Sequence, residues 1–340
     1  MNFMYESYLR TITELSEEAI SKWEICGLYK QTSQTQVDPT LEEDLGIKAR
    51  YAKTKLSRVF RVYTPLNSGI SSQSRILPNL LDLKFVYTKS DSVYHYNCAA
   101  TVTANFHIEI KNAFIALKRV HLYPSIENSI VSRLNNGDPA RFFFRHEYAR
   151  SFSLAAGTSV RRLSNILLTD YLPRFCLITL LEERDYLGHK NATNFNFQTF
   201  NLESLYGKAS GQDYPLDGHF LPEFGTTPET SEYGREYFSL IGAVPGLALR
   251  SDFNHYISQS MWPSGFAIYR MDFSRGSTAF LTNESYLDQR VPCSGLDLYF
   301  KFRTPLTTNV TALVFVSYIE ALSITSNQAN ERGIELNYAL

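Results

Sequence analysis

The chain has 340 residues, a formal net charge of −1 and a sequence pI of about 6.7. This balance lacks the excess of Lys and Arg that wrapping a phosphate backbone requires, so direct nucleic-acid packaging is not expected. Hydrophobic residues make up 44% and charged residues 20%, which excludes a disordered or fibrous protein. The length is typical of two domains, and the 22 Tyr and 23 Phe favour strands and large interfaces.

The cysteines and the N-terminus indicate an intracellular, non-secreted protein. No C-x-x-C pair is present, which predicts reduced, buried thiols at Cys26, Cys98, Cys176 and Cys293. Glutamates within the first 30 residues argue against a secretory leader, and no run reaches the roughly 18 apolar residues of a membrane helix. We therefore interpret the sequons at Asn191, Asn283 and Asn309 as chance matches.

The first third of the chain begins with helical spacing and then changes to strand spacing. Apolar residues recur every three or four positions from Tyr5 to Leu15, and Ser16 can cap a second helix. A period of two then predicts strands or strand pairs at 58–64, 80–87 and 106–122. Polar turn formers separate them at 67–74 and 89–97.

A helix followed by more strands is predicted for the remainder. Pro124 stands at a first-turn position, and Ile126, Ile130 and Leu134 form a stripe that Gly137 ends; we interpret this helix as a domain linker. Strands are predicted at 142–144, 148–154, 174–181, 194–205 and 266–273. The last pair, within 295–318, joins an alternating strand to an apolar strand covered on both faces. The segment 207–252 is predicted as a long, Pro-rich loop with an interfacial role.

Catalytic motifs are absent from the sequence. No Gly-rich phosphate loop and no G-x-S-x-G elbow occur, and His146-Glu147 lacks a second His four residues after the first. We interpret His146 as a strand-edge residue. A Cys–His pair stays open, although no pattern favours it. The sequence predicts no catalytic, cofactor-binding or metal-ligating residue, and no cofactor.

Two residue groups carry an alternative. Paired carboxylates across a cleft could cleave a glycoside, but we interpret the loop acids as solvated surface. These acids are Glu182, Glu183, Asp185, Asp213, Asp217, Glu223, Glu232 and Glu236. Phe195, Phe197 and Phe200, with Tyr206, could stack on a sugar, but the period of two in Phe195 and Phe197 favours burial in a core.

Colinear blocks give the chain a family resemblance. Asn194-Phe195-Asn196-Phe197, followed by Phe200, Leu202 and Leu205, resembles a stretch of the double-jelly-roll major capsid proteins of Polinton (Maverick) elements and their viral relatives. Further blocks are similar in the same order, at 5–23, 120–125, 152–157, 172–174, 235–237, 265–273 and 295–314. The chain departs from the family where Asn194 stands for Pro and Arg270 for an apolar residue.

The resemblance implies a mainly β fold with two antiparallel jelly-roll sandwiches and a short helical N-terminal segment. It places the C-terminal part of the first jelly roll, with a helical insertion, in residues 1–123, and the linker helix and second jelly roll in residues 124–340. Family members carry further strands before the helical insertion, so the first jelly roll is expected to be incomplete, with unpaired edges and exposed apolar surface.

The implied function is a structural, non-enzymatic subunit of an icosahedral virion capsid. Three copies would form a pseudo-hexagonal capsomer that contacts neighbouring capsomers and penton or minor capsid proteins, with no membrane insertion. The alternatives are a carbohydrate-binding or carbohydrate-cleaving jelly-roll protein, and a domesticated capsid fragment that no longer assembles.

Overall fold

The computed structural model describes residues 2–16, 18–31, 34, 38–39, 45–66, 68–72, 75–77, 84–91, 94, 97–98, 102–103, 106–225, 230–242, 256–273 and 290–324. Its helices are α1 (Asn2–Glu14), α2 (Ile20–Trp23), α3 (Leu45–Thr54), α4 (Pro124–Asn135), α5 (Glu183–Tyr186) and α6 (Gly234–Gly242). Short 3-10 turns span Glu24–Cys26, Lys55–Ser57 and Gly69–Ser72. The strands are β1 (Ala140–Leu154), β2 (Val160–Leu163), β3 (Phe175–Glu182), β4 (Leu202–Ala209), β5 (Gln212–Tyr214), β6 (Ile268–Asp272), β7 (Leu296–Phe302) and β8 (Val310–Ile324).

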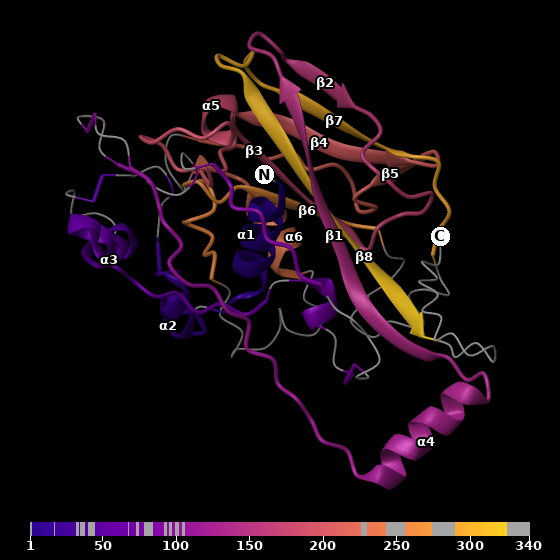
Figure 1. Cartoon of the computed structure of the whole chain (residues 1–340). Coiled ribbons are helices and arrows are strands. Elements are labelled where there is room, and N and C mark those ends of the chain that lie inside the picture. The colour runs from indigo at the N-terminus through magenta and orange to yellow at the C-terminus, as the bar shows by residue number, and fades with distance from the viewer. Residues whose placement is uncertain are drawn as a thin grey trace.

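The strands form two four-stranded antiparallel sheets, ordered β1-β8-β3-β6 and β2-β7-β4-β5. The first strand pairs with the eighth, the second with the seventh, the third with the sixth and the fourth with the fifth. This pairing is that of one long hairpin rolled into a sandwich, which is the jelly-roll arrangement. The prediction of a mainly β, antiparallel jelly-roll chain is confirmed (Figure 1).

The interior of the sandwich lies between alternate residues of the two sheets. Val316 pairs with Cys176, which in turn pairs with Met271 across β3 and β6, so these side chains share a face. A Cβ atom at Gly207 in β4 would lie 3.3 Å from the Met271 sulfur and 3.2 Å from Leu296 Cδ1. The two sheets therefore approach closely at this glycine, and this face of β8 is the interior one.

The opposite face of the same sheet is covered by α1. Leu313 and Phe315 of β8 lie on this outer face and are buried. Tyr5, Leu9 and Ile12, one apolar stripe of α1, are fully buried in the same hydrophobic cluster. Each such side chain contributes roughly 1.5–3 kcal/mol by leaving water. The apolar run of β8 is covered on both faces, as the sequence predicts.

β1 and β8 extend beyond the sandwich as a two-stranded ribbon. They pair over the whole of both strands, whereas β3 pairs with β8 only from Val310 to Ser317. On the overhanging part, Phe142, Leu322 and Ile324 form a second small core with Ile70 and Leu77. The separately predicted strands at 142–144 and 148–154 are thus one continuous strand.

Several predicted strands are wrong. Residues 58–64 and 106–122 run without strand pairing, as do the described residues 84–87 of the strand predicted at 80–87, whose other residues lie outside the described ranges. Alternation of polar and apolar residues shows only that the two faces of an extended segment differ. A strand also needs a neighbouring strand with which it forms backbone hydrogen bonds. At 194–201 no strand forms, because Phe200 and Asn201 adopt φ of 47° and 52°, in the left-handed region.

The region 207–252 is not a long loop where it is described. It contains the end of β4, all of β5, an isolated bridge between Leu205 and Phe220, and α6 packed beside β6. The sequence also missed β2. The helix at α4 is confirmed, with Pro124 in its first turn, and it stands away from the sandwich (Figure 1). The division into 1–123 and 124–340 stays a prediction.

Leu9→Ala tests whether α1 is part of the core. Because Leu9 is fully buried, we expect the free energy of unfolding to fall by about 2–5 kcal/mol, measured by urea denaturation. Phe3→Ala on the same helix is the control, since Phe3 is 51% exposed and its loss should change stability by less than about 0.5 kcal/mol. Equal effects of the two substitutions would show that α1 does not pack as described.

Candidate functional site

Nucleophiles and metal ligands do not converge in the described part of the chain. No group of three or more His, Cys, Asp or Glu side chains that could hold a metal ion occurs there. Cys98, Cys176 and Cys293 are buried free thiols, as predicted, whereas Cys26, which was also predicted to be buried, is a partly exposed free thiol. Burial raises the pKa of both Cys176 and Cys26, which disfavours the reactive thiolate. These thiols are structural in character.

Two of the loop acids are buried, which corrects their interpretation as solvated surface. Asp185 is buried in α5 and accepts a hydrogen bond from Arg184 Nε at 3.3 Å. Glu236 is buried in α6, and its Oε1 accepts a hydrogen bond from the Leu221 amide at 2.9 Å. Burial raises the pKa of both carboxyls. Asp185 and Glu236 lie in different parts of the fold, and each is hydrogen-bonded to its own neighbours. They do not form a pair, and their contacts are those of packed structural residues.

The aromatic cluster is internal. Phe197 is fully buried, and Phe195 stacks on Tyr8 of α1 with ring centroids 3.9 Å apart. Phe200 packs partly buried against the same core. The prediction that these rings serve burial is confirmed, so they offer no stacking surface for a sugar.

Tyr206 lies on the outer face of the second sheet in a stacked row. Its ring lies 3.9 Å from His219 on one side and 4.8 Å from Tyr299 on the other, both nearly parallel. Arg162 lies over Tyr299 and forms an ion pair with Asp297 at 2.6 Å. Because both faces of Tyr206 are covered, this ring is not available to a carbohydrate either.

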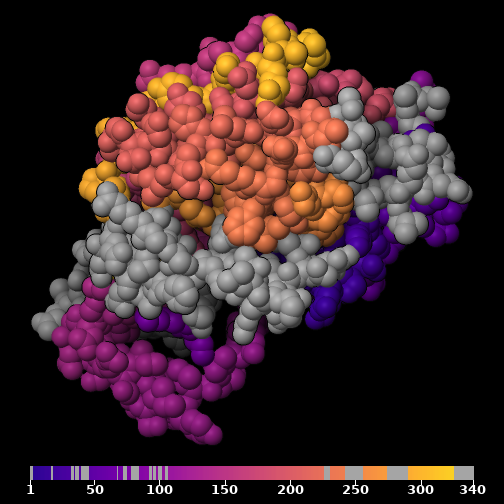
Figure 2. Space-filling view, turned by 180° about the vertical axis from the view of Figure 1, so that it is seen from behind, coloured from indigo at the N-terminus to yellow at the C-terminus, as the bar shows by residue number. Residues whose placement is uncertain are grey.

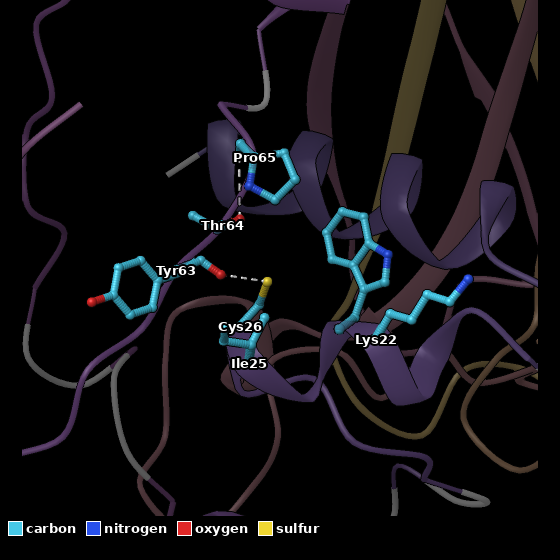
Figure 3. A pocket seen from close by; sticks show the side chains of 7 residues that line it. Lys22, Ile25, Cys26, Tyr63, Thr64 and Pro65 are labelled. Carbon is cyan, nitrogen blue, oxygen red and sulfur yellow. Dashed lines mark hydrogen bonds between the residues drawn. The ribbon is translucent and has the colours of Figure 1, made fainter. Parts of the chain in front are cut away.

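An open hollow of about 310 Å³ lies between the turn after α2 and the extended residues 63–65 (Figure 3). Cys26 Sγ points toward the Tyr63 carbonyl oxygen and donates to it at 2.7 Å. Lys22 supplies the one charged group in its lining. A ligand site needs several polar groups that converge on one position, and this hollow lacks them.

A polar cluster lies on the interior face where the β1–β8 ribbon leaves the sandwich. His146 Nδ1 lies 2.7 Å from Glu320 Oε1, to which the Tyr171 hydroxyl also donates at 3.4 Å. The Glu320 side chain is only 8% exposed, and its Oε2 has no hydrogen-bond partner. His146 is in β1, the edge strand of its sheet, as predicted. The cluster is a histidine–carboxylate pair without a nucleophile.

A second charged cluster lies under α1. Arg10 Nη1 lies 3.5 Å from Glu147 Oε2, and Ser317 Oγ donates to Glu147 Oε1 at 3.1 Å. Glu6 Oε1 accepts a hydrogen bond from the Ala149 amide at 3.1 Å. Burial raises the pKa of Glu147 and of Glu6. These contacts bind α1 to the edge strand β1 and have a structural role.

Exposed apolar side chains are the remaining unusual feature. They gather in the extended segments of the first 123 residues and on α4, in agreement with the exposed apolar surface expected there. They include Val59, Val62, Val86, Ile110, Phe114, Leu117, Val120, Ile126 and Ile130. Exposed apolar surface on this scale is typical of protein or membrane interaction sites and of ligand-binding grooves. In the sequence, these extended segments show the alternation of a strand, but in the described structure they pair with no strand.

His146→Gln tests the histidine–carboxylate pair. The hydrogen bond to Glu320 raises the pKa of His146, so the pair's contribution to stability is full below the unfolded-state pKa of about 6.5 and is lost as pH rises through the folded-state pKa. The Tm difference between wild type and H146Q should therefore be largest near pH 5.5 and shrink toward about pH 8.5.

The same comparison in an E320Q background is the control. Without the Glu320 carboxylate, the pH dependence of the H146Q effect should become much weaker. A small dependence should remain, because the charges of Glu6 and Glu147 also raise the pKa of His146. A Tm difference that is constant with pH in the wild-type background would contradict the assignment.

Comparison with known proteins gives structural likeness only. No protein-family model matches the sequence, and no curated protein matches it. The PBCV-1 virus capsid matches with 12% identity and a TM-score of 0.29, over 55% of this chain and 50% of that one. The major capsid protein P2 from bacteriophage PM2 matches with 9% identity and a TM-score of 0.22, over 53% and 45%.

The Sputnik virophage structure matches with 12% identity and a TM-score of 0.29, over 54% of this chain and 36% of that one. The matched region thus spans about half or less of the length of these capsid chains. In the described residues, no helix combines the length and apolar composition needed to cross a bilayer.

Proposed function

We propose that the chain is a structural subunit of a virus-like capsid and acts without catalysis or cofactor. The observation that carries this proposal is a jelly roll that exposes apolar side chains on extended segments beside it. Jelly rolls occur in capsid and lectin domains, and apolar surface on them suits subunit contacts rather than small ligands. The titratable clusters of the described chain are engaged in packing, which agrees with a structural role.

The finer assignment rests on the sequence resemblance. It comprises a double jelly roll divided at residues 123 and 124, of the Polinton type, assembled as a homotrimeric, pseudo-hexagonal capsomer. Neighbouring capsomers and penton or minor capsid proteins would be its partners, and the virion its location. Closed, symmetric association is the usual state of such subunits.

Residues 207–252 are proposed to contribute to intersubunit contact. Among their described residues, Leu216, Leu221 and Phe238 are exposed although apolar. Deleting 218–231 would not test this cleanly, because Phe220 within it is buried in the core. Substituting the exposed residues Leu221 and Phe238 by Ser leaves the core intact and is therefore a better test of intersubunit contact.

No observation favours the carbohydrate alternative. The rings that could stack on a sugar are buried or covered on both faces. If the chain bound glycans on an array and did not associate with itself, the carbohydrate-binding function would be favoured over the capsid function.

The mass of the purified chain by light scattering after size exclusion, over a tenfold concentration range, tests the proposed function. We expect species at about three times the 38.9 kDa chain mass, or at a multiple of that mass where capsomers join, that persist on dilution. A monomer at every concentration would contradict self-assembly and favour a non-assembling capsid fragment.

A further inference from the structure

Residues 106–122, here named the arm, are the longest exposed apolar segment that the structure describes. The arm is extended, and from 107 to 122 it shares no backbone–backbone hydrogen bond with another described residue. Phe114 is 69% exposed and Leu117 66% exposed. Figure 1 shows the extended trace that leads to α4, and Figure 2 shows α4 with the adjoining end of the arm, in magenta, projecting at the margin of the molecule. The arm therefore presents backbone donors and acceptors as well as apolar side chains.

Local contacts occupy little of the arm. Lys89 Nζ donates to the Ile108 carbonyl oxygen at 2.6 Å. The Tyr63 ring meets Phe114 edge-on with centroids 6.2 Å apart, and Glu109 pairs with Lys111 at 3.4 Å. These contacts leave most of the arm's backbone and both its faces accessible.

We propose that the arm pairs antiparallel with the same arm of a second copy of this chain, about a two-fold axis at Phe114. The inference rests on the proposed function and deepens it: a two-fold pair of arms would join one capsomer to a neighbouring one and is separate from the three-fold contacts within a capsomer. A strand with unpaired backbone groups is satisfied by adding a neighbouring strand, and an antiparallel pair of identical strands is symmetric.

The side-chain pattern selects this register. Centring the pair on Phe114 places the two Phe114 rings opposite each other and sets Ile108 opposite Val120 on the same face. Aromatic and β-branched cross-strand pairs of this kind stabilise antiparallel sheets. In a pair about a two-fold axis, side chains of one face lie opposite side chains of the same face, so the alternative registers are shifts by an even number of residues.

The charges select it over shifts of two residues. In the register centred on Phe114, Glu109 of each copy lies opposite Arg119 of the other, which gives two ion pairs. A shift of two residues in one direction sets Lys111 opposite Arg119, and a shift in the other sets Glu109 opposite Leu117. The first of these shifts also pairs apolar side chains, with Ile108 opposite Leu122 and Ile110 opposite Val120, so the charges decide between the two registers.

Two features favour a second copy of this chain as the partner of the arm: the continuity of the exposed apolar surface and the low net charge. The exposed stripe of α4, with Ile126, Ile130 and Val131, begins directly after the arm, so one surface continues from strand to helix. A formal net charge of −1 produces little long-range repulsion between two copies. A second copy also supplies the matching pattern without a further component.

Cysteine cross-linking tests the pairing directly. In a Cys26→Ser background, which leaves the buried native thiols, Phe114→Cys places two thiols on neighbouring strands about 4.5–5.5 Å apart between Cα atoms, within disulfide reach. Leu117→Cys is the matched control, since it is equally exposed but its two copies would lie about 20 Å apart, six residues along the strands.

We expect F114C to form a covalent dimer on mild oxidation, seen on a non-reducing gel, and L117C to stay single. Equal cross-linking of both variants, or of neither in a chain that light scattering shows to associate, would overturn the arm pairing while leaving the proposed function standing. A chain that is monomeric throughout would contradict both.

Charge reversal provides the second test. E109R or R119E alone sets like charges opposite each other twice per dimer and should raise the dissociation constant by about tenfold. The double variant E109R/R119E restores opposite charges and should recover the wild-type value. Loss in the double variant as large as in either single one would show that these residues do not face each other. All five positions substituted in these tests lie outside the buried core, and unchanged thermal melting confirms folding.

Discussion

The burial of the outer face of the β1-β8-β3-β6 sheet under α1 is the contact on which the rest of the structure depends. β8 is apolar on both faces, so a sandwich of two sheets alone would leave Leu313 and Phe315 in water. Tyr5, Leu9 and Ile12 of α1 cover that face and join the main hydrophobic cluster. The result is three layers, in which a helix from the first 14 residues completes a jelly roll formed by residues 140–324.

This arrangement explains why buried charges surround β1. As an edge strand of the described sheet, β1 has backbone groups on one side with no described strand beside them, and Glu6 of α1 accepts a hydrogen bond from one of these, the Ala149 amide. Glu147 beside it is compensated by Arg10 and Ser317, because a buried carboxylate left alone would be costly. On the interior face, His146 compensates one oxygen of Glu320. The same strand therefore holds a polar cluster on each face, and both fix its position rather than perform chemistry.

What could be predicted from the sequence depends on how local the signal is. The stripe from Tyr5 to Leu15, the helix that begins at Pro124 and the two-sided burial of β8 all follow from periodicity, and all are present. Periodicity could not show that 107–122 finds no paired strand among the described residues, nor that Phe200 turns the chain into the left-handed region. The burial of Asp185 and Glu236 could not be predicted, because it results from tertiary contacts that no local sequence pattern records. Glu236, for example, accepts its hydrogen bond from the amide of Leu221, outside α6.

The distribution of unsatisfied groups indicates where this molecule can do work on a partner. Among the described residues, Glu236 and His146 are held by hydrogen bonds, and burial raises the pKa of the Cys176 thiol. Burying apolar surface is worth about 25 cal/mol per Å², and many exposed apolar side chains lie on the extended segments and on α4, outside the sandwich. Under the proposed function, the free energy of association would come from these segments, whose strand-like pattern finds no paired strand within the described fold.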